Sequence, residues 1–168
     1  MHRFLLIYSW FVRTILFFFP DIPIIMRFRG WLYGLGMKKC GKDFQVAHSV
    51  ILNTIEKLSI GNNVYIANFC SFILNGDISI GNEVLLGPNC VVSSGNHVFD
   101  GNSFRYEKAS IKSVIIADAC WISANCTIIG GSVLPERSIL AAGSVLLKKY
   151  EIKNSIYAGI PATFLKSI

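Results

Sequence analysis

The chain has 168 residues, a length typical of one domain with a sizeable core, and 52% of them are hydrophobic. Its formal net charge of +6 is uneven, because residues 1–43 contain seven basic and two acidic residues whereas residues 44–168 are nearly balanced. The basic pI of about 9.2 is therefore a property of the N-terminal part, and we expect no nucleic-acid partner.

The five cysteines exclude a disulfide framework and a cysteine-rich metal site, since no two have CxxC spacing. We expect buried thiols, no metal cofactor, and a reducing, cytoplasmic setting. The cysteines are Cys40, Cys70, Cys90, Cys120 and Cys126.

Residues 4–19 form an apolar stretch that predicts one helix ending at Pro20. The stretch is short for a membrane span, contains Arg13, and is followed by no small-residue cleavage site. Two interpretations remain equally open. The helix covers the open end of the fold that follows, or it lies in a membrane interface, at the inner face of the cytoplasmic membrane.

A second short helix is expected between Arg27 and Lys39. Together these segments make residues 1–43 an apolar, basic N-terminal helical cap. This cap is also the part of the chain for which we predict peripheral contact with a membrane.

A six-residue repeat dominates residues 44–149. From Val114 to Leu146 it runs without a slip, and a small or apolar residue stands two places before each repeating one. Side chains at i−2 and i lie on one face of an extended segment, and six residues are too few for a hairpin with its turn. The pattern therefore predicts an all-β solenoid of short parallel strands. The repeating residues are Val46, Leu52, Ile60, Ile66, Phe72, Ile80, Leu86, Val92, Ile116, Ile122, Ile128, Leu134, Leu140 and Leu146.

The repeat is interrupted after Leu52, Phe72 and Val92, the last time by a long inserted loop at 93–113. If three hexads make one turn of a triangular prism, all three interruptions lie at one corner. By the same count Asn68, Pro88, Ala124 and Ala142 share a different corner. After residue 149 the repeat stops, and residues 150–168 are expected to cap the last turn.

His97 is the candidate for acid–base chemistry, because it lies at the root of the long loop. Loops on a rigid scaffold often carry functional sites, and imidazole exchanges a proton near neutral pH. His2 lies in the terminal segment, and His48 falls at a corner where we expect it to be solvated. On its own, a loop histidine is more often an ordinary surface residue.

Several motifs together resemble the hexapeptide-repeat acyltransferases. They are Leu58-Ser-Ile-Gly-Asn-Asn, Ile78-Ser-Ile-Gly-Asn-Glu, Gly95-Asn-His, Cys120-Trp-Ile-Ser-Ala-Asn, Leu140-Ala-Ala-Gly-Ser-Val and Gly159-Ile-Pro-Ala. The chain resembles the galactoside, maltose and xenobiotic acetyltransferase branch, and most of all the O-acetyltransferases of bacterial surface polysaccharides. The resemblance covers roughly residues 36–168. It implies a left-handed β-helix, a homotrimer with sites between subunits, and acetyl-CoA as donor.

The resemblance also implies roles for individual residues. His97 matches the catalytic general base, and Asn68 matches an asparagine that holds the saccharide acceptor. Ala124 and Ala142 match positions whose backbone amides contact CoA. Three further CoA contacts are implied at Trp121, Lys148 and Lys166, for which a surface aromatic and solvated lysines are the plain alternatives.

Two other functional classes are built on the same kind of prism. A γ-type carbonic anhydrase shares the prism but needs three histidines around a metal, which His2, His48 and His97 cannot supply. A non-catalytic structural or binding solenoid remains the alternative. The long loop with His97 favours an acetyl-CoA-dependent O-acetyltransferase that acts on a sugar hydroxyl of a surface polysaccharide or its precursor.

Overall fold

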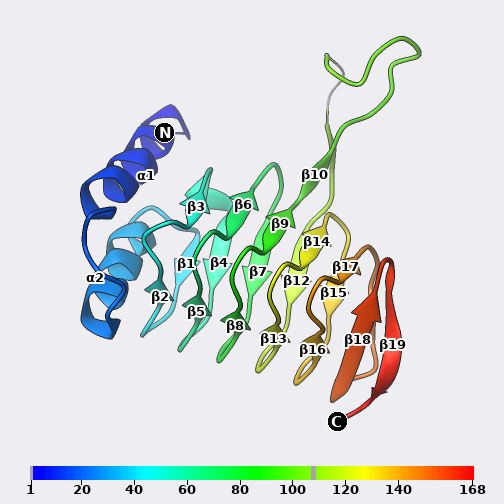
Figure 1. Ribbon diagram of the computed structural model, residues 1–168. Coiled ribbons are helices and arrows are strands. Elements are labelled where there is room, and N and C mark those ends of the chain that lie inside the picture. Colours follow the sequence, from blue (N-terminus) through cyan, green and yellow to red (C-terminus); the bar gives the residue numbers. More distant parts are fainter. Residues whose placement is uncertain (1, 107–108) are drawn as a thin grey trace.

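The computed structural model describes residues 2–106 and 109–168, and it is a three-sided solenoid of parallel strands with two helices at its N-terminal end (Figure 1). This architecture confirms the predicted left-handed hexapeptide β-helix. Glu107 and Lys108, within the predicted loop, lie outside the described residues.

Three sheets form the faces of the prism, and each turn adds one strand to each sheet. Sheet A contains β1 (Lys39–Cys40), β4 (Leu58–Ile60), β7 (Ile78–Ile80), β12 (Val114–Ile116) and β15 (Val133–Leu134). Sheet B contains β2 (Gln45–Val46), β5 (Tyr65–Ile66), β8 (Leu85–Leu86), β13 (Trp121–Ile122), β16 (Ile139–Leu140), β18 (Ser155–Gly159) and β19 (Ala162–Ser167). Sheet C contains β3 (Ile51–Leu52), β6 (Ser71–Ile73), β9 (Val91–Ser93), β14 (Thr127–Ile129) and β17 (Val145–Leu146).

The core is the stack of residues that the six-residue repeat selects. Every predicted inward residue from Val46 to Leu146 is at most 3% exposed. Four of the five cysteines are buried as well, as predicted. Stacked turns bury one continuous inner row, which explains how two-residue strands can be stable.

The corners of the prism follow the predicted arrangement. We call them AB, BC and CA after the sheets that they join. All three interruptions of the repeat follow strands of sheet C and so lie at the CA corner. The first contains a short 3₁₀ helix, η1 (Ile55–Lys57), and the third is the long loop, whose stalk pairs β10 (Gly95–Asn96) with β11 (Ser110–Ile111).

The BC corner contains the other predicted group. Main-chain hydrogen bonds connect Asn89 to Asn68, Asn125 to Pro88, and Gly143 to Ala124 in successive turns. The residues of this corner are therefore stacked, one turn above another.

The N-terminal helices differ from their predicted bounds. Helix α1 spans His2–Leu16, and α2 spans Pro23–Gly34 with Pro23 in its first turn, where a missing N–H is tolerated. The second helix cannot extend to Lys39, because Lys39 already belongs to β1 and pairs with β4. No helix in residues 2–106 or 109–168 is long and apolar enough to cross a membrane.

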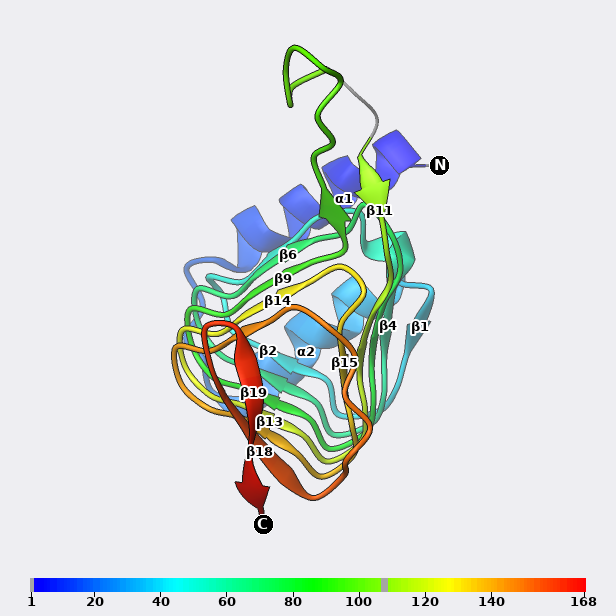
Figure 2. The ribbon, with the colours of Figure 1, turned by 90° about the vertical axis from the view of Figure 1, so that its right-hand side faces the viewer.

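The C-terminal segment is an antiparallel hairpin, β18–β19, which adds two strands to the end of sheet B. A view along the solenoid shows the hairpin nearest the viewer, the long loop projecting from one corner, and the helices behind (Figure 2). The two ends of the solenoid are thus closed by different devices.

Candidate active site

Backbone amides at the AB corner are covered by side chains from the next turn. The N–H groups of Lys42, Asn62 and Asn82 donate to Asn62 Oδ1, Asn82 Oδ1 and Asp118 Oδ1 at 2.8, 2.9 and 2.8 Å. Two further side-chain bonds join Asn62 to Asn82 and Asn82 to Asp118. This ladder satisfies the amides that point away from the prism.

At the BC corner the same positions lack such a cover. The residue one turn above Ala124 is Ala142, and the residue above Asn68 is Pro88, so neither offers a side-chain acceptor. Within residues 2–106 and 109–168, the N–H groups of Asn68, Ala124 and Ala142 donate no hydrogen bond. The BC corner therefore presents free amide donors on the outside of the solenoid, which suits a ligand rich in carbonyl oxygens.

Buried thiols fix the carbonyl side of this corner. The Sγ atoms of Cys70, Cys90 and Cys126 lie 3.2, 3.1 and 3.1 Å from the carbonyl oxygens of Gly87, Ser123 and Ala141. Each of these carbonyls directly precedes a residue of the BC corner. Cys90 and Cys126 thus contact the peptide units that carry the free N–H groups of Ala124 and Ala142, and this gives these two cysteines a structural role.

Trp121 flanks the corner from the outer face of sheet B. It belongs to β13, three residues before Ala124, and its side chain is 49% exposed. A half-exposed indole beside free amides can pack against a ligand lying along the corner. The structure therefore places Asn68, Ala124 and Ala142 in separate turns of one corner, with Trp121 on the adjoining face of sheet B.

The two predicted lysines lie elsewhere. Lys148 follows β17 at the CA corner, where its Nζ lies 5.4 Å from the ring centroid of Tyr150. Lys166 pairs with Ile156 in the β18–β19 hairpin, away from the end of the hairpin near the BC corner. Both residues are exposed.

His97 lies just beyond the loop stalk at the CA corner, and it is exposed. It lines a shallow hollow with Ser103, Phe104 and Arg105. The loop turns back on itself because Asp100 accepts hydrogen bonds from the N–H groups of Asn102 and Ser103, which lowers the pKa of its carboxyl group.

One chain therefore does not complete the predicted site. His97 lies at the CA corner, whereas Asn68, Ala124 and Ala142 lie at the BC corner, and the whole width of sheet C separates the two. No cluster of three metal-ligating side chains occurs among residues 2–106 and 109–168 either. In one chain, the imidazole of His97 and the free backbone amides of the BC corner therefore lie on separate corners.

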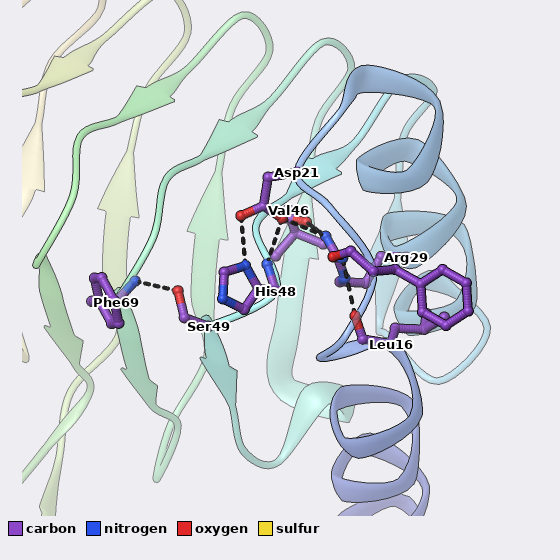
Figure 3. A network of polar contacts seen from close by, with 8 residues as sticks. Leu16, Asp21, Arg29, Val46, His48, Ser49 and Phe69 are labelled. Carbon is purple, nitrogen blue, oxygen red and sulfur yellow. Dashed lines mark hydrogen bonds and ion pairs between the residues drawn. The ribbon is translucent and has the colours of Figure 1, made fainter.

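A polar network around Asp21 and His48 was missed by the sequence analysis (Figure 3). His48 lies at the BC corner one turn before Asn68. His48 is not solvated as predicted. It is half-buried, its imidazole Nδ1 lies 2.7 Å from Asp21 Oδ2, and its backbone N–H donates to Asp21 Oδ1 at 2.8 Å. The partner comes from the link between α1 and α2, so nothing in the spacing of the repeats could reveal it.

Arg29 completes the network from inside the protein. It is fully buried, and it donates to Asp21 Oδ1 and to the carbonyl oxygens of Leu16, Phe19 and Val46. Burial acts to raise the pKa of Asp21, but the bonds from His48 and the charge of Arg29 outweigh it and lower the pKa below its usual value. Asp21 is therefore a carboxylate that accepts, and His48 Nδ1 carries the donated hydrogen.

Known proteins resemble this chain along most of its length. WcaF of Escherichia coli, provisionally named as a colanic acid biosynthesis acetyltransferase, is 22% identical over 157 residues, or 94% of this chain and 84% of WcaF. A crystal structure of a hexapeptide-repeat acetyltransferase from Vibrio cholerae in complex with acetyl-CoA superposes with a TM-score of 0.85, at 22% identity, and the match covers 98% of this chain and 87% of that one. The chain is related to the hexapeptide-repeat acetyltransferases. The predicted resemblance is thus confirmed.

The relatives differ in length. A galactoside O-acetyltransferase of E. coli is 26% identical over 129 residues, which cover 76% of this chain and 63% of that enzyme. A protein of Schizosaccharomyces pombe, provisionally named as an acetyltransferase, is 31% identical over 108 residues, so this chain spans half of its length. No protein-family model matches the sequence. Named acetyltransferases are thus the relatives of this chain, which supports an acyltransferase.

Proposed function

We propose that the protein is an acetyl-CoA-dependent O-acetyltransferase, which acetylates a sugar hydroxyl of a surface polysaccharide or its precursor. The observation that carries the proposal is the row of free amides at the BC corner, next to Asn68 and Trp121. Pantetheine contains two amide carbonyls and ends in the thioester, so it offers acceptors along its length. The names of the relatives support the same donor and acceptor classes.

In the proposed reaction, His97 transfers the proton and the free amides stabilise the developing negative charge. The imidazole of His97 takes the proton from the acceptor hydroxyl as its oxygen attacks the thioester carbon. An amide N–H at the BC corner stabilises the negative charge that forms on the carbonyl oxygen. When the carbon–sulfur bond breaks, His97 returns the proton to the leaving thiolate. Asn68 positions the acceptor, and the solenoid supplies a rigid frame for these groups.

The proposal requires more than one copy of the chain. The long loop projects from the solenoid (Figures 1 and 2) and carries Phe99, Phe104 and Tyr106 exposed at 54, 61 and 81%. Aromatic side chains on a projecting loop suit burial against a neighbouring molecule. In a homotrimer, the loop of one copy brings His97 to the BC corner of the next. Lys148 and Lys166 then lie on surfaces where they attract the CoA phosphates.

The proposal also includes contact with the inner face of the cytoplasmic membrane through the N-terminal cap. Phe4, Ile7, Phe11 and Ile15 form one exposed stripe along α1, at 67, 66, 54 and 48% exposure. The excess of basic residues in residues 1–43 adds attraction to anionic lipid headgroups. A cap of this kind both closes the solenoid and lies on a lipid surface, so the two interpretations of the helix are compatible.

The enzymatic test is release of the CoA thiol from acetyl-CoA in the presence of candidate saccharides. We expect His97→Ala to lower turnover by about 10²- to 10⁴-fold, because it removes the base, while acetyl-CoA binding stays nearly unchanged. His2→Ala is the matched control, because His2 is an exposed histidine on α1 that takes no part in the proposed proton path. Turnover by His97→Ala equal to that of the wild type would contradict the role of His97.

A further inference from the structure

An apolar groove of about 390 Å³ lies between the end of α1 and the first turns of the BC corner. Phe17 and Phe18 form one wall, and Phe69 and Ile51 form the other, with Ser49 between them and Arg13 and Thr14 on the helix side. Phe69 directly follows Asn68 in the sequence. The groove therefore ends beside the residue to which we assign acceptor binding.

Phe69 is an unusual residue for its position. It has φ 62°, in the left-handed region, and its side chain is 63% exposed. In the later turns of the same corner the position is taken by Asn89, Asn125 and Gly143, which adopt this conformation more readily. A bulky side chain in the left-handed region costs about 1 kcal/mol, and an exposed ring regains little of it. The fold alone thus does not select a phenylalanine here.

The groove is held in shape by the network of Figure 3. The N–H of Phe69 donates to Ser49 Oγ at 2.9 Å, and the ring of Phe17 packs edge-on against the imidazole of His48 with centroids 5.1 Å apart. His48 is itself fixed by Asp21. Both walls are therefore held by contacts with the first turn of the solenoid, so a ligand would find the groove already formed.

Arg13 gives the groove one positive charge. No acidic residue lines the groove, and Arg13 makes no ion pair within the described residues 2–106 and 109–168. The two carboxylates of the cap are engaged elsewhere, Asp21 by Arg29 and His48, and Asp43 by Arg27. The groove thus combines aromatic walls with a cation, which suits an apolar chain that carries an anionic group.

We propose that this groove binds the apolar chain of an acceptor whose sugar is joined to a lipid through a phosphate. The chain lies between Phe17, Phe18 and Phe69, and the phosphate faces Arg13. The identity of the bound molecule as the acceptor rests on the proposed function, but binding of the lipid phosphate does not. The alternative occupants of the groove are a bilayer surface and a second copy of the chain, and the experiment distinguishes them from the lipid phosphate.

The experiment is a calorimetric titration of the full-length protein with monomeric dodecyl phosphate, without acetyl-CoA. We expect saturable binding at one site per chain, weakened about tenfold by Phe69→Asn, which removes an aromatic wall, and about fivefold by Arg13→Gln, which removes the cation. Phe4→Asn and Arg3→Gln are matched controls on α1 outside the groove, and neither should change the affinity. Inorganic phosphate and dodecyl maltoside, which lack one of the two features, should each bind more weakly.

Folding does not limit this test, because asparagine suits the conformation at residue 69. The melting temperature of Phe69→Asn should equal or exceed that of the wild type. Equal affinity of wild type and Phe69→Asn would overturn the proposal. If Phe4→Asn weakened dodecyl phosphate binding as much as Phe69→Asn does, the binding would belong to a lipid-facing surface. If Phe69→Asn changed the oligomeric mass, the groove would be an interface between copies of the chain. Since no turnover is measured, a failed titration leaves the acetyltransferase proposal standing, and an inactive enzyme leaves the groove proposal standing.

Discussion

Asp21 shows how much one side chain contributes to the joint between cap and solenoid. It receives bonds from His48 at the first turn and from the buried guanidinium of Arg29 on α2. A buried arginine without its carboxylate is strongly unfavourable, since the charge is then uncompensated. The link between the two helices is therefore fixed by an ion pair and not by apolar contacts alone.

We expect Asp21→Asn to lower the free energy of unfolding at pH 7 by about 3 kcal/mol. The pKa of Asp21 is lower in the folded protein than its usual value of 3.8, so its contribution is present above that pH and is lost as the pH falls through the lower, folded value. The difference between wild type and variant should thus shrink below about pH 4. Urea unfolding at a series of pH values measures it.

Asp43→Asn is the control for this prediction. Asp43 pairs with the exposed side chain of Arg27, and surface pairs of this kind contribute about 0 to 1 kcal/mol. If Asp21→Asn destabilised the protein no more than Asp43→Asn does, the network would not be the joint that we describe.

Residue positions within the repeat were predictable, and positions outside it were not. The inward row and the shared corner of Asn68, Ala124 and Ala142 follow from counting hexads, because each turn repeats the same geometry. His48 also falls on that corner, but its environment depends on Asp21, which lies in an irregular link. The groove beside Phe69 depends on the same link, so neither could be found by periodicity.

Among the elements, the ends of the chain were less predictable than the solenoid. The second helix starts four residues before its predicted beginning at Arg27. It ends before β1, because Lys39 pairs with β4 and belongs to sheet A. The β18–β19 hairpin was expected only as a capping turn and a short segment. The hairpin forms because β18 pairs with β16 of the last turn, and the sequence around residues 155–167 contains no pattern that predicts this pairing.

Helix α1 is the element for which membrane contact can be tested directly. We expect the triple variant Phe4→Ser, Phe11→Ser, Ile15→Ser to lose most of its sedimentation with anionic vesicles, because these side chains form the exposed stripe. The protein should stay folded, since the residues of α1 that pack inward, Ser9, Val12 and Leu16, are unchanged.

The matched control for α1 is Ile152→Ser, Leu165→Ser, Ile168→Ser, three changes of exposed residues near the other end of the chain. The control variant should bind vesicles like the wild type. Equal sedimentation of the two triple variants would show that α1 only closes the solenoid, and the predicted membrane contact would be withdrawn.

On the scale of the whole molecule, the three corners of the prism have different tasks. The AB corner is sealed by a ladder of Asn62, Asn82 and Asp118, the BC corner leaves its amides free, and the CA corner extends the loop with His97. A regular solenoid thus becomes a candidate enzyme through the choice of corner residues alone. Because His97 and the free amides lie on separate corners of one chain, the proposed mechanism requires the loop of a neighbouring copy.

The most direct test of this account is calorimetric titration with acetyl-CoA of the wild type, Ala142→Pro and Ala142→Gly. Proline removes the amide N–H at a corner that already contains Pro88, whereas glycine keeps it. We predict binding near one site per chain for wild type and Ala142→Gly, and about tenfold weaker binding for Ala142→Pro, as expected for one lost hydrogen bond to a ligand carbonyl. No binding of acetyl-CoA to the folded wild type, or equal affinity of all three proteins, would contradict the assignment of the BC corner as the donor site.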